Sequence, residues 1–247
     1  RGMIEMQDFL KSTIRDAGAI AREYFDKGVT YTTKSHLADL VTEADTGVSD
    51  FLIQKIQAAY PTHSITSEEV KGTINPGGQY EWLIDPVDGT RNFAHGISIW
   101  CIIIAVVRDG EPWLGAVYNP IANELFFAEK DHGAFLNSMP IRVNSKNDFE
   151  FVTCSFSRMP RKTAVYGTHI DEYKQFLDNM NRKTGAWIHQ FGCMLGTCYV
   201  ANGGLDFCAQ NGGLDHDYVA QLLIAEESVA KVTDCEWNPW KRGRQDI

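Results

Sequence analysis

Two aspartates three residues apart, Asp85 and Asp88, are the most informative chemical feature of this 247-residue sequence. They follow the apolar run 82–84, which is typical of the end of a buried strand. Pro86 fixes one backbone angle and lacks an N–H, so we expect the carbonyl of Val87 to face outward rather than into a ladder. Hard divalent cations prefer carboxylate and carbonyl oxygens. The motif therefore predicts a metal site on a sharp turn.

The next two residues, Gly89 and Thr90, stand where a helix could begin. Backbone N–H groups at a helix N-terminus bind anions, and phosphate is a frequent one. Oxygen ligands beside such amides suit a divalent cation and a phosphate bound together. Two plainer explanations remain open at this point. The aspartates could only stabilise a local turn, and Thr90 could act only as a helix cap.

Three other acidic segments could complete such a site. Glu68 and Glu69 follow the short strand-like run 63–66, whereas Asp217 precedes the amphipathic run 218–226 and would then open a helix. Asp45 ends the polar segment 34–45. Each also has an ordinary alternative: a solvated loop end for the glutamates, a helix N-cap for Asp217, and a first-turn helix carboxylate for Asp45.

Taken together, the four segments resemble the inositol monophosphatase family of Mg²⁺-dependent, lithium-sensitive phosphatases. That family carries D-L-V-T-x-x-D, a Glu-Glu pair, D-P-[IL]-D-G-T-x-N-F and W-D-x-A-A-G. The first three motifs match closely at 39–45, 68–69 and 85–93, and the fourth matches only at Asp217 and Ala220. The resemblance runs from about Lys34 to Asp234 in the family's order.

The resemblance implies roles for these residues. Two Mg²⁺ ions would be bound, with a weaker third ion near Glu68. The first ion would be held by Glu68, Asp85 and the carbonyl of Val87, and the second by Asp85, Asp88 and Asp217, with Asp85 bridging. The catalytic residues would be Asp45, Thr90 and Glu68, with Thr90 and Asp45 polarising the attacking water. The N–H groups of Gly89 and Thr90 would hold the phosphate.

The departures from the family lie on the substrate side. Inositol-cleaving members carry a Glu seven residues before the last metal-binding Asp, where this sequence has Gln210. His216 stands in place of the usual Trp, and Gln221 in place of a Gly. We expect Gln210 and His216 to contact the substrate. Lys34 could approach the phosphate or pair with a carboxylate, and the sequence does not separate the two.

The amino-acid composition limits the classes of molecule that this protein could bind. A net charge of −9 argues against a nucleic-acid polymer, although bound cations would still permit a phosphorylated substrate. The longest apolar run, 97–107, is too short to span a membrane as a helix, and we read it as one buried strand. The six cysteines contain no C-x-x-C pair, so we expect reduced core thiols in a cytoplasmic protein. The resemblance implies a homodimer.

Periodicity predicts a mixture of helices and antiparallel strands, and hence an α+β or layered α/β fold. Its layer order, an αβαβα sandwich of the sugar-phosphatase type, is implied by the resemblance alone. We expect one compact unit with a soft boundary between halves 1–147 and 148–247. The family continues with another strand and a helix, which we expect to lie outside this sequence. Helices are predicted over 6–25, 48–59, 170–180, 194–201 and 218–226, and strands over 29–34, 63–66, 97–107, 113–118, 124–129, 151–157, 187–190, 205–209 and 229–233, with a hairpin turn at 108–111.

The sequence thus predicts an Mg²⁺-dependent phosphomonoesterase that uses a metal-activated water on a small phosphorylated metabolite. Inositol monophosphate is the leading substrate. Histidinol phosphate, fructose 1,6-bisphosphate and a 3′-phosphonucleotide are the alternatives within the family. A hypothesis of another class is a non-catalytic metal-binding module kept for interaction with a partner.

Overall fold

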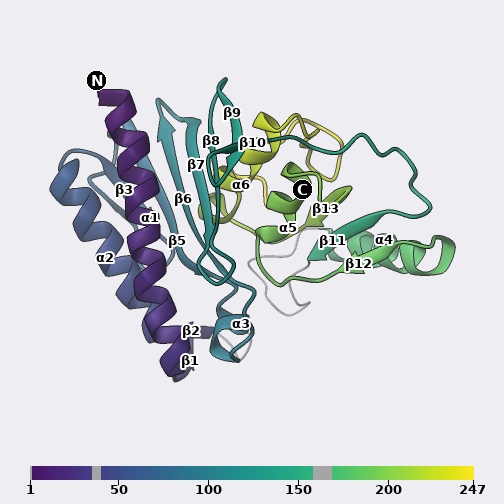
Figure 1. Cartoon of the computed structure of the whole chain (residues 1–247), viewed down its shortest axis with the longest axis horizontal. Helices are drawn as coiled ribbons and strands as arrows, with labels where there is room; N and C mark the ends of the chain where they lie inside the picture. Colours follow the sequence, from purple (N-terminus) through teal and green to yellow (C-terminus); the bar gives the residue numbers. More distant parts are fainter. Residues whose placement is uncertain (1, 35–39, 158–168) are drawn as a thin grey trace.

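The computed structural model describes residues 2–34, 40–157 and 169–247. Its central element is an eight-stranded sheet in the order β10-β9-β8-β7-β6-β5-β3-β4 (Figure 1). Strands β3 and β5 are parallel, and the other neighbours are antiparallel. The strands are β3 (Ser64–Ser67), β4 (Thr73–Ile74), β5 (Tyr80–Asp88), β6 (Cys101–Arg108), β7 (Glu111–Asn119), β8 (Glu124–Glu129), β9 (Gly133–Leu136) and β10 (Met139–Ile141).

Two long helices, α1 (Gly2–Lys27) and α2 (Glu43–Ala59), cover one face of this sheet (Figure 1). Their apolar stripes are buried against alternate residues of β5 and β6, such as Trp82 and Ile104. A two-stranded antiparallel ribbon, β1 (Tyr31–Thr33) and β2 (Leu40–Thr42), connects the two helices. The ribbon delivers the chain to the start of α2, where one of the candidate catalytic carboxylates lies.

The opposite face of the sheet packs against α5 (Leu195–Ala201) and α6 (Asp215–Glu227). Gly115 on β7 explains how closely α6 approaches, because a Cβ added there would lie 2.7 Å from the carbonyl oxygen of Ala220. Helix α6 is buried continuously from Tyr218 to Ala225. The expectation of an amphipathic helix is therefore wrong, since α6 is covered on more than one side.

A second, three-stranded parallel sheet in the order β12-β11-β13 lies beyond α5. It consists of β11 (Thr153–Ser157), β12 (Trp187–His189) and β13 (Phe207–Gln210), and α4 (Ile170–Lys183) packs on it through Met180. The layers therefore alternate from α1 and α2, through the large sheet, α5 and α6, and the small sheet, to α4 (Figure 1). This confirms the αβαβα sandwich.

Two predicted strands are wrong in part or in whole. Strand β6 begins at Cys101, and Ile97 and Ile99 are exposed by 46% and 37%, so the first residues of the run 97–107 are not buried sheet. The predicted strand 229–233 does not form; Val229 has a φ of 74°, and only an isolated bridge joins Thr233 to Pro239. The sequence does not predict strands β2, β4, β9 and β10.

The predicted hairpin at 108–111 is confirmed, with Asp109 and Gly110 at positive φ between β6 and β7. All six cysteines are free thiols, as expected. Within the described ranges, no helix has both the length and the apolar character needed to cross a membrane.

Candidate metal-dependent active site

The predicted turn after residues 82–84 is a bulge inside a strand rather than the end of one. Strand β5 continues to Asp88, and its register against β6 shifts between Asp85 and Asp88. One oxygen of Asp85 accepts the backbone N–H of Val87 at 3.1 Å. A bulge leaves backbone groups unpaired and re-aims side chains. The local turn at 85–88 therefore forms, and the same turn brings the carboxylates of Asp85 and Asp88 together.

Three carboxylates, Asp85, Asp88 and Asp217, converge so that their ligand atoms all lie within 4.8 Å of one another. Asp85 is 2% exposed and Asp88 is 8% exposed. Burial and the charge of Asp217 raise the pKa of Asp88 to about 8. Burial, followed by the charges of Glu68 and Asp88, also raises the pKa of Asp85 well above its usual value. In the absence of a cation, these groups therefore disfavour one another's ionisation.

A second group brings Asp45 and Thr90 together beside the bulge. The Thr90 hydroxyl lies 2.9 Å from a carboxylate oxygen of Asp45 and 2.9 Å from the carbonyl oxygen of Val87. A hydroxyl carries one proton, so it donates to one of these acceptors at a time. The other oxygen of Asp45 accepts the N–H and the hydroxyl of Thr42, which forms a capping box at the start of α2.

Burial raises the pKa of Asp45, whereas the hydrogen bonds from Thr42 and Thr90 lower it in part. Asp45 is thus a carboxylate in the first turn of α2, which is the simpler of the two roles considered from the sequence. It is also in contact with Thr90. A buried carboxylate with a raised pKa is a better proton acceptor than a solvated one.

Glu68 lies at the edge of this arrangement. Among the described residues it is not part of the three-carboxylate cluster, although its charge acts on Asp85 and on Asp45. Lys34 places its ammonium 3.3 Å from Glu68 and 2.6 Å from the more buried Glu69. Burial alone would lower the pKa of Lys34, but the two glutamates raise it. In this structure Lys34 pairs with carboxylates, as the second of its two alternatives proposed.

Asp217 is the third residue of α6 and not its N-cap, because the helix begins at Asp215 with Leu214 as the cap. One oxygen of Asp217 accepts the backbone N–H of Leu214 at 2.7 Å. That bond fixes the carboxylate at the helix start and directs it toward Asp85 and Asp88. The ring of His216 lies 3.6 Å from the same oxygen, at the margin of the cluster.

Gln210 ends β13 and is 1% exposed. Its side-chain oxygen lies 3.4 Å from the amide nitrogen of Gln221, whose amide nitrogen also donates to the backbone carbonyl of Asp217. Among the described residues, the amide nitrogen of Gln210 and the oxygen of Gln221 have no hydrogen-bond partner. The two carboxamides therefore form a buried, incompletely paired contact one helical turn from Asp217.

Gly89 has a φ of 90° and precedes the short helix α3 (Thr90–Ala94). A Cβ at Gly89 would lie 3.1 Å from the Cβ of Cys193, so both its backbone angle and its packing favour glycine. The position of Gly89 and Thr90 at a helix start is as predicted. The predicted motif residues 35–39, which include Asp39, lie outside the described residues.

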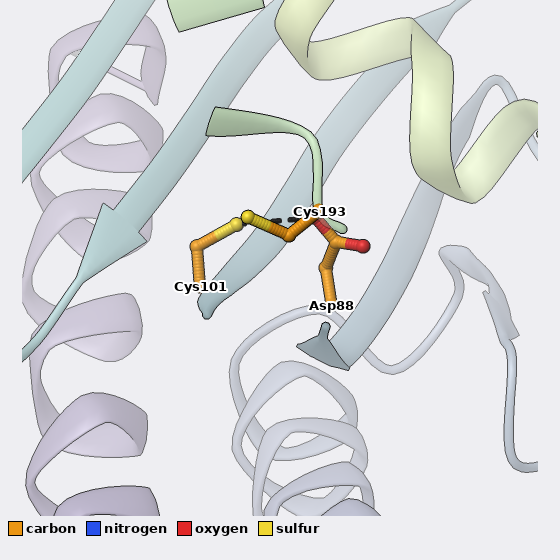
Figure 2. Close-up of side chains that lie close together, drawn as sticks. All are labelled: Asp88, Cys101 and Cys193. Atoms are coloured by element: carbon orange, nitrogen blue, oxygen red, sulfur yellow. Dashed lines mark hydrogen bonds between the residues drawn. The ribbon is translucent and has the colours of Figure 1, made fainter. Parts of the chain in front are cut away.

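Sequence reasoning missed the groups behind Asp88. One oxygen of Asp88 accepts the backbone N–H of Met194 at 2.5 Å and the thiol of Cys101 at 3.3 Å, and Cys193 lies beside them (Figure 2). The segment before α5 is more than a hundred residues away in sequence, since Met194 is 106 residues from Asp88. No local pattern marks such a contact.

The donor set fits a hard divalent cation. Three carboxylates share one buried space, and burial together with the charges of neighbouring carboxylates raises the pKa of Asp85 and of Asp88. A cation would offset that repulsion. Hard oxygen donors of this kind are typical of magnesium sites rather than of structural zinc sites.

Comparison with known proteins places this arrangement in a family. A model of the inositol monophosphatase family matches residues 3–246. An inositol monophosphatase of Mesembryanthemum crystallinum is 33% identical over 244 residues, covering 94% of this chain and 87% of that protein. A fructose-1,6-bisphosphatase/inositol-1-monophosphatase of Thermotoga maritima is 31% identical over 227 residues, with 92% and 84% covered. The solved structure of a Thermotoga maritima IMPase superposes with a TM-score of 0.86 at 29% identity, covering 98% of this chain and 90% of that one.

Proposed function

Because the chain belongs to the inositol monophosphatase family and is a phosphoric monoester hydrolase, we propose that it hydrolyses a small phosphorylated metabolite with metal-activated water. The observation that carries this proposal is the buried convergence of Asp85, Asp88 and Asp217. The Thr90–Asp45 contact next to the cluster supplies the acid–base partner.

The family supports a divalent metal cofactor, and we propose Mg²⁺ as that ion. Asp85 would bridge two ions, with Glu68 and the Val87 carbonyl on one side and Asp88 and Asp217 on the other. A third ion would be weaker and near Glu68. When bound, such ions neutralise phosphoryl charge and lower the pKa of a coordinated water. Lithium would inhibit by replacing the ion held by Asp88 and Asp217.

The chain's own residues would then perform three tasks. The Thr90 hydroxyl, already 2.9 Å from Asp45, would orient the attacking water and pass its proton to that carboxylate. The backbone N–H groups of Gly89 and Thr90 would hold the phosphate. Asp85, Asp88 and Asp217 are each fixed by a backbone N–H donor, which reduces reorganisation during the reaction.

The alcohol part of the substrate would lie toward Gln210 and His216. A Glu at position 210 could accept two hydroxyl hydrogen bonds with charge assistance, whereas a Gln offers a neutral acceptor and two donors. We therefore propose an inositol monophosphate-like substrate with a broader tolerance than an inositol-specific enzyme has. Fructose 1,6-bisphosphate, histidinol phosphate and a 3′-phosphonucleotide remain the substrates to compare with it.

A phosphate-release screen over these metabolites, with Mg²⁺ and with a chelator, tests the proposal. We expect release from at least one of them that depends on added Mg²⁺ and is lost in the Asp85→Asn variant. Full activity after chelation would contradict the metal-dependent mechanism. Metal binding without release from any metabolite would favour the interaction-module hypothesis instead.

A further inference from the structure

Asp88 is shared between two different sets of potential ligands. On one side it meets the carboxylates of Asp85 and Asp217. On the other side, ligand atoms of Asp88, Cys101 and Cys193 also lie within 4.8 Å of one another (Figure 2). The thiol of Cys101 donates to Asp88 at 3.3 Å. A second cluster, with sulfur donors, therefore adjoins the oxygen cluster through a common carboxylate.

The fold fixes both thiols in this place. Cys101 is the first residue of β6 and pairs in register with Asp88 across the sheet. Cys193 lies just before α5 and packs against Gly89, so its position follows from that of the Asp88 turn. Cys101 is fully buried and Cys193 is 3% exposed, and both are free thiols. Their packing role alone would not require two sulfurs facing the same carboxylate.

We propose that Cys101, Cys193 and Asp88 form a binding site for Zn²⁺. It shares Asp88 with the carboxylate site and differs from that site in its two sulfur ligands. Soft thiolates select zinc over magnesium, while a carboxylate is an acceptable further zinc ligand. Around one tetrahedral zinc with Zn–S bonds of about 2.3 Å, ligand atoms lie roughly 3.8 Å apart. The present separations are all within 4.8 Å, and that between the Cys101 sulfur and the Asp88 oxygen is 3.3 Å, so they are close to this geometry.

Such a site would make zinc an inhibitor. Zinc held by the two sulfurs would draw Asp88 away from the carboxylate cluster, so that Zn²⁺ and Mg²⁺ would oppose each other's binding. By linkage the opposition is reciprocal. This consequence for catalysis rests on the proposed function, whereas the zinc site itself does not.

Cobalt provides the test, because Co²⁺ occupies zinc sites and shows a thiolate-to-metal charge-transfer band that carboxylate ligands do not give. We expect metal-free protein to develop this band with Co²⁺ and to lose it on addition of Zn²⁺. Cys101→Ser and Cys193→Ser should each weaken Co²⁺ binding at least about tenfold, since loss of even an indirect contact to a metal ligand has an effect of that size. Cys154→Ser is the matched control, because Cys154 is equally buried but lies in the second sheet.

Absence of the band in the wild type, or its undiminished persistence in a folded Cys101→Ser or Cys193→Ser variant, would overturn the proposal. Circular dichroism on each variant checks its folding, and either cysteine variant alone suffices for the comparison. Phosphate release with Mg²⁺ is measured on the same protein preparations without cobalt or zinc. A cobalt band without phosphatase activity would contradict the proposed function but support the zinc site. Phosphatase activity without the band would support the proposed function and contradict the zinc site.

Discussion

Two carboxylates of the metal cluster are held by near neighbours, whereas Asp88 is held by the distant Met194 and the neighbouring carboxamides contact each other. Asp85 and Asp217 accept backbone N–H groups from residues two or three positions away, and Asp45 is held by Thr42 in the same manner. Gln210 and Gln221 come from a strand and a helix and meet at 3.4 Å. Each leaves one polar atom without a partner in the part of the chain that the structure describes.

The two kinds of support correspond to two functions within the site. Locally bonded carboxylates are placed before any ligand arrives, which is what electrostatic catalysis requires. The incompletely paired carboxamides keep unused hydrogen-bonding capacity, and a buried polar group without a partner is unfavourable by about 1–3 kcal/mol. We infer that the metal cluster defines the reaction, whereas the carboxamide pair is the part that can adjust to the substrate.

The largest effect is expected at Asp85, the carboxylate common to both proposed metal positions. Asp85→Asn removes one negative charge from the centre of the cluster and should abolish Mg²⁺-dependent phosphate release. Steady-state assays over a range of Mg²⁺ concentrations would measure the loss. Asp109→Asn, in the exposed turn between β6 and β7, is the charge-matched control and should be active. Substantial activity in Asp85→Asn would mean that the bridging role is wrong.

The next effect concerns the Thr90–Asp45 contact. Thr90→Ala and Asp45→Asn should each lower kcat by on the order of 10²–10⁴, the usual scale for a positioned acid–base group, with a smaller change in KM. Thr46→Ala, at an exposed position on α2, serves as the control because its hydroxyl contacts only the backbone of Glu43. A kcat near that of the wild type in both variants would exclude the pair from the mechanism.

Local bonding also explains which parts the sequence could predict. The turn at 85–88, the first-turn position of Asp45 and the hairpin at Asp109 and Gly110 depend on near neighbours, and each is visible as a short pattern. The pattern does not show that the first turn is a bulge inside a strand, or that Thr42 and Asp45 form a capping box. Ile97 and Ile99 misled the strand prediction, because apolar identity does not reveal whether a residue is covered.

Long-range contacts account for the rest. The N–H of Met194 and the thiol of Cys193 reach Asp88 only because α5 packs on the large sheet. The Gln210–Gln221 contact likewise depends on how β13 and α6 meet. The family spacing predicts that Gln210 contacts the substrate. The sequence around either glutamine does not show that Gln210 is buried against Gln221.

A third prediction uses the pKa of Asp88, which burial and the charge of Asp217 raise. In metal-free protein the pKa of Asp88 is about 8, against 3.8 for the ordinary group. Between these values the folded state binds more protons than the unfolded state, so the free energy of unfolding should fall as pH rises. Each pKa unit corresponds to about 1.4 kcal/mol. Thermal unfolding of chelated protein at pH 5 and pH 8 would measure the decline.

Mg²⁺ should reverse that decline, and it should stabilise the protein more at pH 8 than at pH 5, because it binds the ionised carboxylates. Asp88→Asn is the informative variant, since it removes a group that titrates in this window. Its metal-free stability should depend less on pH than that of the wild type. An equal pH dependence in the two proteins would show that Asp88 is not the source of the repulsion.

The smallest expected effect tests the carboxamide side. Gln210→Glu replaces the unpartnered amide nitrogen with a second acceptor and places a charge where ring hydroxyls could donate to it. We expect kcat/KM for inositol monophosphate to rise by the factor that corresponds to about 1–2 kcal/mol of extra transition-state binding. This is the scale of one charged hydrogen bond. Competing assays with fructose 1,6-bisphosphate would show whether the preference changes, and Gln54→Glu on the exposed side of α2 controls for added charge.

This last experiment also decides where the alcohol lies. Gln210 is almost completely buried, so a substrate can reach it only if the contact with Gln221 opens or if the substrate enters beside Asp217. The added carboxylate in Gln210→Glu would also lie near the cluster and disfavour its ionisation, which opposes the expected gain. A changed ranking of substrates separates the two effects, because repulsion within the cluster lowers activity on every substrate alike. If the ranking stays the same, Gln210 does not face the alcohol, and the carboxamide pair serves packing rather than specificity.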